Sequence, residues 1–310
     1  MSTTTTRSGR PRLSDRAKEE RRLGWKLAGP AFVIMILVTF YPILQAVYTS
    51  LFQYRLTDPG SRQFVLFENY LIVLRDPLWW QAFGTTALIT VVTVVVELVL
   101  GFLIALAMAK VLDGRGLLRT IVLIPYSIIT VVSAFSWLYA FATDTGFVDP
   151  LLNSLTFGIF PKDFDWFGDF WASMVPICVS EIWKTTPFMS LLLLAGLTQI
   201  DSAMEEAAIV DGATWGERMR RVVLPNMKSA IMVALLFRTL DAFRIFDNIF
   251  IMTAGSHDTA SLSLVAYNQT ISRTEVGLGS AVSVLLFLCV VVIAVIFVRG
   301  FRVDLAQGRR

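Results

Sequence analysis

Four long stretches of the sequence lack Asp, Glu, Lys and Arg, and they constrain the fold more than any other feature. They lie at 27–54, 77–96, 120–143 and 276–298, and the shortest holds 20 residues. An α-helix needs about 20 apolar residues to cross a hydrocarbon core of about 30 Å. Helices of soluble proteins instead combine a polar with an apolar face. The four stretches therefore predict four membrane spans.

Two further apolar segments carry a few charges. The first, 170–200, contains Glu181 and Lys184, and the second, 229–254, contains four charged residues. One ionised side chain at mid-membrane costs about 2.5–3.5 kcal/mol on insertion scales, which long apolar flanks can offset. We therefore expect an all-α integral membrane protein with six transmembrane helices, at 28–52, 80–109, 119–141, 170–198, 229–253 and 276–298.

The amount and placement of charge indicate how the chain lies in the membrane. Apolar residues make up 55% of the sequence and charged residues 16%, against about 25% charged in soluble domains. This composition excludes a disordered chain, a nucleic-acid module and most soluble enzymes. Nineteen Lys and Arg residues lie on one side of the predicted spans and five on the other, so both termini are expected in the cytoplasm. The net charge of +3 then reflects orientation and not nucleic-acid binding.

These features divide the chain into three expected regions. Residues 1–26 form a basic, mobile cytoplasmic tail, and residues 301–310 form a second cytoplasmic tail. Residues 27–300 form a six-span domain whose longest cytoplasmic loop is 199–228. The expected location is the plasma membrane, with the chain crossing it several times.

The chain lacks the side chains that most enzymes need. Its one histidine, His257, lies in a predicted external loop, so neither a histidine zinc site nor a Ser/His nucleophile is expected. No Gly-Lys pair occurs, which excludes a phosphate-binding P-loop. Cys178 and Cys289 fall within spans and are interpreted as small buried side chains. We predict no catalytic residue, no metal site and no cofactor in this chain, so a conduit is the simplest function.

The loop at 199–228 is predicted to fold as two helices around a glycine. Ser-x-x-Glu from Ser202 and Thr-x-x-Glu from Thr214 both have the spacing of a capping box. Gly212 lies between them and favours a helix end, and Pro225 is expected to stop the second helix. An amphipathic connector at the lipid surface and a rigid docking element both fit this pattern, and the paired caps favour the second.

The same loop resembles the EAA loop of ABC-importer permeases. The resemblance lies in Glu206-Ala207-Ala208, then Gly212, then Val222 and Leu224-Pro225, with valine at 222 where isoleucine is usual. In that family the loop is a coupling helix, which docks in a cleft of an ATPase subunit and transmits its closure to the membrane helices. By resemblance, the ATPase-coupling residues are Glu205, Glu206, Ala207, Ala208, Asp211, Gly212, Arg218 and Pro225.

The resemblance covers nearly the whole chain. Residues 67–70, 181–188 and 243–248 match the external loop and the fourth and fifth spans of carbohydrate permeases, in particular the first permease subunit of actinobacterial trehalose importers. Residues 254–257 depart from the usual Gly-Gly-Pro, which leaves the conformation of the external loop 254–275 open. The resemblance implies a type I ABC-importer permease architecture and import of a disaccharide, with trehalose preferred and maltose or a glycerol phosphodiester as alternatives.

The resemblance also implies a set of partners. They are a second permease subunit in a heterodimer, two copies of a cytoplasmic ATPase that bind ATP and Mg, an extracytoplasmic sugar-binding protein or lipoprotein, and membrane lipid. No nucleic acid is expected. A secondary transporter is the main rival, but it predicts internal repeats, and we detect none in the sequence.

The charges of the predicted fifth span recur every three residues, at Arg238, Asp241, Arg244 and Asp247. Neighbours in this row lie close together on a helix and alternate in sign, so Arg238 should pair with Asp241 and Arg244 with Asp247. Such a row cannot face lipid. It must face a water-filled cavity, another helix or a partner subunit, and both the sugar path and contact with the second permease remain open as interpretations.

The predicted fourth span offers a second part of a path. Pro187 frees the carbonyl of Trp183, and broken helices at membrane depth are tolerated beside cavities. Glu181 and Lys184 either neutralise each other or line the path. Aromatic faces suit sugars, although aromatic side chains also serve packing. The candidate substrate-path residues are Glu181, Trp183, Lys184, Phe243, Arg244, Phe246, Asp247, Asn248 and Phe250. Glu97 is a further charge within a span.

Overall fold

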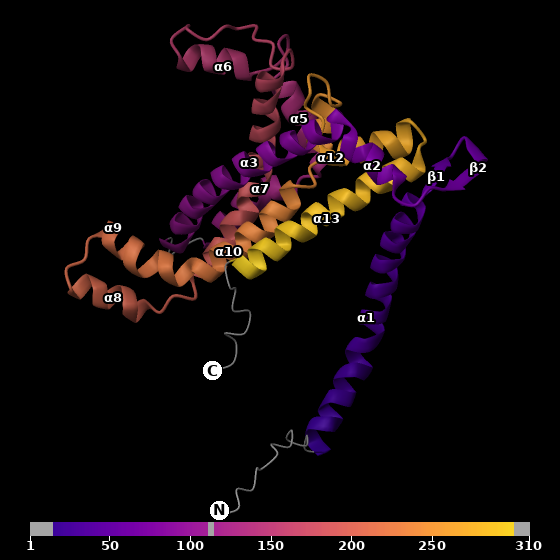
Figure 1. Cartoon of the computed structure of the whole chain (residues 1–310). Coiled ribbons are helices and arrows are strands. Elements are labelled where there is room, and N and C mark those ends of the chain that lie inside the picture. The colour runs from indigo at the N-terminus through magenta and orange to yellow at the C-terminus, as the bar shows by residue number, and fades with distance from the viewer. Residues whose placement is uncertain (1–14, 111–114, 301–310) are drawn as a thin grey trace, which may run out of the picture.

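The computed structural model describes residues 15–110 and 115–300, which are mostly helical (Figure 1). In chain order the helices are α1 (Asp15–Ser50), α2 (Glu68–Arg75), α3 (Pro77–Lys110), α4 (Arg115–Ser127), α5 (Thr130–Ala140), α6 (Val148–Leu155), α7 (Phe170–Leu197), α8 (Ser202–Val210), α9 (Trp215–Arg218), α10 (Leu224–Ala242), α11 (Asp247–Met252), α12 (Leu262–Tyr267) and α13 (Val276–Gly300). Two π-helical segments, η1 (Met219–Val223) and η2 (Asn268–Ser272), complete the helical part.

A small hairpin corrects the expectation of an all-α fold. Strands β1 (Phe52–Arg55) and β2 (Asp58–Phe64) pair antiparallel directly after α1. Phe52 lies opposite Phe64 in the register, and their rings pack 5.2 Å apart. Cross-strand aromatic pairs of this kind stabilise a hairpin. The chain is therefore mostly helical with one two-stranded hairpin among the described residues.

Four described helices are long and apolar enough to span a membrane. They are α3, α7, α13 and the part of α1 from Arg22 to Ser50. These helices coincide with the predicted spans at 28–52, 80–109, 170–198 and 276–298. The agreement follows from their composition, because α1, α3 and α13 each contain about 20 or more positions without charge and α7 carries only Glu181 and Lys184.

The predicted third and fifth spans are broken helices rather than continuous ones. Helices α4 and α5 meet at an angle of 84°, because the backbone at Ile129 is extended, with φ −58° and ψ 135°. The fifth span divides into α10 and α11 around Phe246, which has φ −138° and ψ −61°. Counting the bent pair α4–α5 as one span gives up to five candidate spans in the described residues. Helix α10 is not among them, since it carries Lys228, Arg238 and Asp241.

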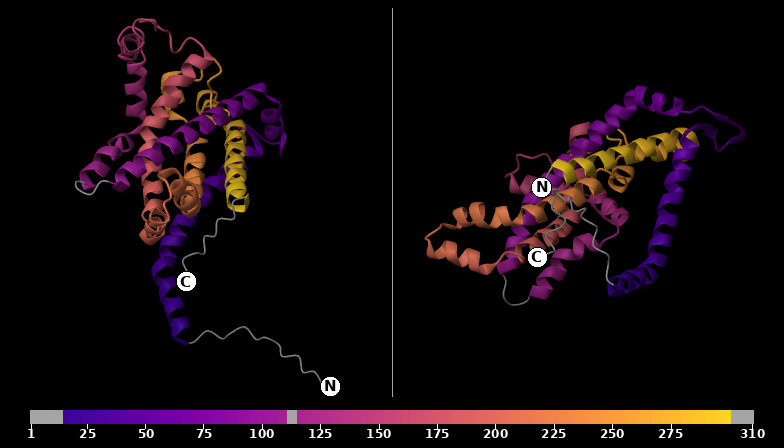
Figure 2. Two further views of the ribbon diagram at one scale, coloured as in Figure 1. Left: turned by 90° about the vertical axis from the view of Figure 1, so that its left-hand side faces the viewer. Right: turned by 60° about the horizontal axis from the view of Figure 1, so that its bottom comes forward.

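Helix α1 diverges from the other helices and approaches them only near its C-terminal end (Figures 1 and 2). No residue of its most apolar window is buried within this chain, so this face is left for lipid or another subunit. Residues 15–26 of the predicted basic tail form the first turns of α1. Residues 1–14 of that tail, and the whole predicted tail at 301–310, lie outside the described residues.

The core that positions the site is a close packing of α3, α7 and α10. Small residues allow the approach: a Cβ on Gly101 of α3 would lie 2.8 Å from the Met189 side chain of α7. A Cβ on Gly196 of α7 would lie 2.4 Å from the Cβ of Ala230 on α10. Helix α6 lies at one end of this bundle, and α8 and α9 project from the other (Figures 1 and 2).

The contact at Gly196 can be tested by substitution. We expect Gly196→Val to destabilise the chain by about 1–3 kcal/mol, because the alanine Cβ opposite cannot move and α7 must separate from α10. Thermal unfolding of the purified protein in detergent measures this loss. Gly84→Val is the matched control, since a Cβ at Gly84 of α3 meets nothing within 4 Å. Equal losses for the two variants would contradict the packing described here.

Candidate substrate path and coupling loop

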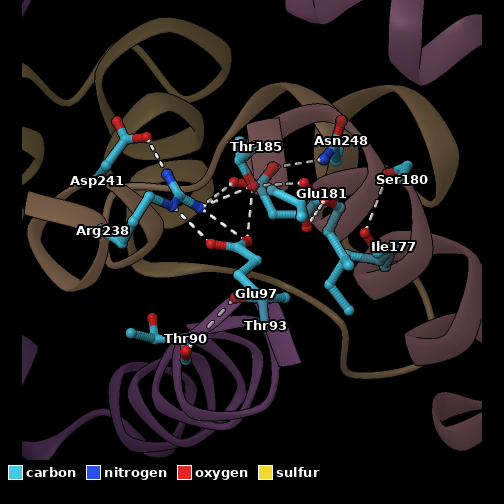
Figure 3. A network of polar contacts seen from close by, with 12 residues as sticks. Thr90, Thr93, Glu97, Ile177, Ser180, Glu181, Thr185, Arg238, Asp241 and Asn248 are labelled. Carbon is cyan, nitrogen blue, oxygen red and sulfur yellow. Dashed lines mark hydrogen bonds and ion pairs between the residues drawn. The ribbon is translucent and has the colours of Figure 1, made fainter. Parts of the chain in front are cut away.

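The centre of the helix bundle holds a buried guanidinium bound by carboxylates from three helices (Figure 3). Arg238 of α10 is 1% exposed, and Glu97 of α3 is 0% exposed. Arg238 Nε lies 2.6 Å from Glu97 Oε2, and Arg238 Nη2 lies 3.0 Å from Glu97 Oε1. This is a two-point pair, the strongest arrangement available to arginine and a carboxylate. Arg238 Nη2 also donates to Glu181 Oε1 of α7 at 3.2 Å, and Nη1 to Asp241.

Two uncharged side chains extend this network. Thr185 donates its hydroxyl to Glu97 Oε1 at 2.6 Å and accepts from Arg238 Nη2 at 3.1 Å. Asn248 of α11 donates from Nδ2 to Glu181 Oε2 at 3.0 Å. Figure 3 shows these side chains converging from four helices. The buried charges of Arg238, Glu97 and Glu181 therefore each have a partner on another helix, as a buried charge requires.

A cavity of about 430 Å³ adjoins this network. Glu181 and Asn248 reach both the network and the cavity wall. The Oδ1 atom of Asn248 is buried and has no hydrogen-bond partner among the described residues. The wall is formed by Tyr126, Thr130, Glu181, Lys184, Thr185, Asp241, Arg244, Ile245, Phe246, Asp247 and Asn248.

Six of the nine predicted path residues line this cavity, and three do not. The six are Glu181, Lys184, Arg244, Phe246, Asp247 and Asn248. Trp183 instead packs edge-on against Trp137 at 5.7 Å, and Phe243 packs edge-on against Phe83 at 6.0 Å. Phe250 stacks on Phe246 with ring centroids 5.1 Å apart. Of the three, Phe243 is buried, whereas Trp183 and Phe250 are exposed in this chain, and their role in the path stays a prediction.

The structure confirms one of the two charge pairs predicted in the fifth span. Arg238 and Asp241 are bonded. Arg244 and Asp247 form no ion pair within the described residues, and Arg244 Nε donates to the carbonyl of Leu240 at 3.2 Å. The spacing rule fails there because α10 ends at Ala242 and the backbone changes direction before Asp247.

The pairing of Glu181 with Lys184 is also absent among the described residues. Glu181 is bonded to Arg238 and Asn248. Lys184 donates instead to the carbonyl of Ile128, at 2.7 Å. The partner of Arg238 that the sequence did not identify is Glu97, which lies 141 positions before it. Its sequence signal was a lone carboxylate in an apolar span, which requires a compensating cation.

The coupling loop contains the predicted turn and one of the two predicted capping boxes. Thr214 and Glu217 form a reciprocal capping box at the start of α9, and the hydrogen bonds from Thr214 lower the pKa of Glu217. Helix α8 begins one residue earlier than predicted: its cap is Asp201, which accepts from Ala203 N at 3.0 Å, and not Ser202. Aspartate caps a helix as well as serine does.

Gly212 ends α8 with φ +76°, a conformation that favours glycine. Its N–H bonds to the Ile209 carbonyl at 3.0 Å, and the N–H of Ala213 bonds to the Ala208 carbonyl at 3.0 Å. These two bonds are the Schellman motif. Glu206 is exposed and faces solvent in this chain.

The other coupling positions hold the two short helices together. Arg218 lies 3.8 Å from Glu205 across the turn, measured from Nη1 to Oε1. Ala207 is exposed, Ala208 is half-buried and Asp211 is the C-terminal cap of α8. Pro225 does not stop the second helix, which corrects the prediction. The wide π turn η1 precedes it and lets the chain pass into α10 with Pro225 in the first turn.

The buried network predicts a large effect when Arg238 is lost. Arg238→Met leaves Glu97 and Glu181 without a cation, and we expect a loss of about 3–5 kcal/mol in stability. Thermal unfolding in detergent measures it. The control Arg244→Met should change stability by less than about 0.5 kcal/mol, because Arg244 is exposed and bonds only to its own helix. The double variant Arg238→Met with Glu97→Gln should regain part of the stability that Arg238→Met loses, because it removes one unpaired carboxylate. A double variant as unstable as Arg238→Met would contradict this charge argument.

Comparison with known proteins places the chain in a family. A family model described as the inner membrane component of binding-protein-dependent transport systems matches residues 97–303. The chain is 48% identical to the trehalose transport system permease protein SugA of Mycobacterium tuberculosis, over 91% of this chain and 89% of that protein. It is 36% identical to the trehalose/maltose transport system permease protein MalF of Thermococcus litoralis, over 90% of this chain and 94% of that protein.

The fold agrees with this placement. A chain of a bacterial ABC transporter involved in alginate import has a TM-score of 0.75 and 20% identity, and the match covers 94% of this chain and 100% of that one. The chain therefore belongs to the binding-protein-dependent transport system inner membrane components, as a multi-pass permease subunit of an ABC importer that is not itself an enzyme.

Proposed function

We propose that this permease imports a disaccharide, with trehalose as the preferred substrate, through the cavity beside Glu181 and Asn248. The cavity carries the proposal: its volume of about 430 Å³ lies within the usual range for small-ligand sites. Its wall combines a ring, that of Phe246, with several polar side chains. The names of the two relatives, one for trehalose and one for trehalose/maltose, support the choice of substrate.

The chemistry of the cavity suits a neutral sugar. Tyr126 and Thr130 line the cavity, and their hydroxyl groups can donate to or accept from a sugar hydroxyl. Asp241 and Asp247 supply further acceptors on the same wall, and Arg244 supplies donors. Arg238 is bound by three carboxylates, so its charge is not available to an anionic substrate. The charged groups of the wall are three carboxylates, those of Glu181, Asp241 and Asp247, and two cations, Lys184 and Arg244. This negative balance favours trehalose or maltose over a glycerol phosphodiester.

We further propose that the chain crosses the membrane six times with both termini in the cytoplasm. The bent pairs α4–α5 and α10–α11 would supply the two spans that are not continuous helices. The excess of Lys and Arg on the side of α8 and α9 supports this orientation. Helix α6 would then face the outside and the loop at 199–228 the cytoplasm, and these elements do lie at opposite ends of the bundle (Figure 1).

In the proposed mechanism, α8 and α9 dock on an ATPase subunit. The capping box of α9 and the Schellman turn at Gly212 make the two helices a rigid unit. Exposed side chains such as Glu206, Ile209 and Trp215 are free to contact a partner. The unit continues through η1 directly into α10. Closure of two ATPase copies, which bind ATP and Mg, would thus move α10 and alternate the access of the cavity.

The remaining proposed partners follow from the same assignment. A second permease subunit would complete the path and cover apolar surface such as α1, which is not buried in this chain. An extracytoplasmic sugar-binding protein or lipoprotein would deliver the substrate on the side of α6. Uptake of labelled trehalose by proteoliposomes with the whole transporter tests the function, with maltose and a glycerol phosphodiester as competitors. Competition only by the phosphodiester would refute the proposed substrate.

The coupling role predicts sharp effects in the loop. We expect Gly212→Val to abolish uptake, since a β-branched residue is strained at φ +76°. Gly212→Asn should retain most of the uptake, because asparagine tolerates this conformation and a Cβ there meets nothing within 4 Å. Glu206→Lys should also abolish uptake while the exposed side chain leaves the fold unchanged. Uptake in vesicles and the amount of chain in the membrane are measured together. Normal uptake by Gly212→Val and Glu206→Lys would refute the assignment.

The path role predicts a different outcome at the cavity. Asp247→Ala and Asn248→Ala should reduce sugar uptake tenfold or more while the two permeases still copurify, because both residues line the cavity. Trp183→Leu is the control, since Trp183 packs against Trp137 away from the cavity wall. If Asp247→Ala instead prevents copurification, that residue joins the subunits and does not line a path.

A further inference from the structure

Lys184 is a buried cation whose hydrogen bonds go to backbone carbonyls. Its residue is 8% exposed in the middle of α7. The Nζ atom lies 2.7 Å from the carbonyl oxygen of Ile128 and 3.5 Å from that of Tyr126. Both carbonyls lie at the junction where α4 ends and α5 begins at 84°. The cation therefore sits at the break of the bent span.

The end of α4 needs such a donor. The last carbonyls of a helix have no partner within it, and at membrane depth no bulk water replaces one. Backbone bonds at the junction run from Ile128 N to the Pro125 carbonyl at 3.3 Å and from Ser133 N to the Ile129 carbonyl at 3.0 Å, so neither uses the carbonyls of Tyr126 and Ile128. The C-terminal end of a helix also carries partial negative charge, which favours a cation. One ammonium group thus donates to two carbonyls and is attracted by the partial negative charge at the end of α4.

The ring of Tyr126 strengthens the same contact between α4 and α7. It lies 5.7 Å from Lys184 Nζ, within range of a cation–π interaction. It also stacks on Phe188 of α7, with centroids 5.2 Å apart and an interplanar angle of 12°. The end of α4 is therefore joined to one turn of α7 by hydrogen bonds and by ring contacts.

The bend fixes one wall of the cavity. Tyr126 precedes the junction and Thr130 follows it, and both line the cavity. Helix α5 in turn contacts α11, which carries Asn248. A change in the angle between α4 and α5 would displace Thr130 relative to Asn248 and alter the shape offered to a ligand.

We propose that Lys184 is a positioning residue that closes the C-terminal end of α4 and holds the α4–α5 bend, and thereby sets the affinity of the cavity for its sugar. The part of this inference that concerns sugar affinity rests on the proposed function. The part that concerns the α4–α5 bend does not. Lys184 acts through Tyr126 and Thr130 and contributes no ion pair to Glu181, whose oxygens are bonded to Arg238 and Asn248.

The bend can be measured directly in the assembled transporter. Spin labels at Leu117 and Ser136, both exposed and on opposite sides of the junction, report the distance across it by electron resonance. We expect a broader or shifted distance in Lys184→Met, which has no donor. Lys184→Arg should keep the distribution of the unmodified chain, because its guanidinium retains both the charge and the donors. An unchanged distribution in Lys184→Met would overturn the proposal.

The affinity is measured as sugar-stimulated ATP hydrolysis by the same complexes with trehalose-loaded binding protein. For Lys184→Met we expect the apparent KM to rise about tenfold, with the maximal rate kept within about twofold. Lys184→Arg should restore the KM. A raised KM in both variants with unchanged label distances would assign Lys184 to direct sugar contact and refute the positioning role.

Two further outcomes are distinguished by this design. If Lys184→Met does not assemble, Lys184→Gln keeps two N–H donors but no charge and should give an intermediate distance distribution, and a distribution identical to that of the unmodified chain would refute the role. If no sugar stimulates hydrolysis in the unmodified complex, the proposed function fails. The label distances still decide whether Lys184 holds the bend.

Discussion

The bond between Arg238 and Glu97 is the interaction on which the arrangement of the spans depends. An unpaired charge within the hydrocarbon is expensive, so each of these side chains is tied to the other. Because they come from α10 and α3, and Glu181 comes from α7, the pairing fixes three helices at one depth (Figure 3). Close contacts at Gly101 and Gly196 bring the same helices near enough for the side chains to meet. Packing and electrostatics therefore specify one geometry.

The two broken spans follow from the same need to satisfy polar groups. A membrane helix can break only where its freed backbone groups find partners. At the α4–α5 junction Lys184 supplies them. At the α10–α11 junction Ser261 donates to the carbonyl of Ile245 at 2.9 Å. Both junctions border the same cavity, whose wall includes Tyr126 and Ile245. The breaks thus provide the polar surface that continuous apolar helices could not.

The sequence predicted what depends on local composition and missed what depends on partners distant in the chain. Runs without charges located α1, α3 and α13, and an apolar segment with two charges located α7, all to within a few residues apart from the earlier start of α1. The capping motif at Thr214 located α9. The pairing of Arg244 with Asp247 was wrong because the spacing rule assumes an unbroken helix. The bond to Glu97 was missed because nothing in 141 intervening positions specifies which helices pack together. Six of the nine predicted path residues line one cavity, because charged and polar side chains of membrane helices avoid lipid.

The loop that carries α8 and α9 leads directly into α10, which holds Arg238 of the buried network. This continuity explains how docking on α8 and α9 could change the shape of the cavity. Helix α10 starts at Leu224, directly after η1, and Arg238 lies about 21 Å further along at 1.5 Å per residue. A π turn is a frequent feature of functional helices, because its wide geometry is less stable than the α-helix around it. In the proposed mechanism, α8 and α9 move as one body, since Arg218 and Glu205 link them. Any displacement of α10 must then shift Arg238 against Glu97 and Glu181, and Glu181 also forms part of the cavity wall. The side chains that hold the spans together are therefore the ones that would carry the motion.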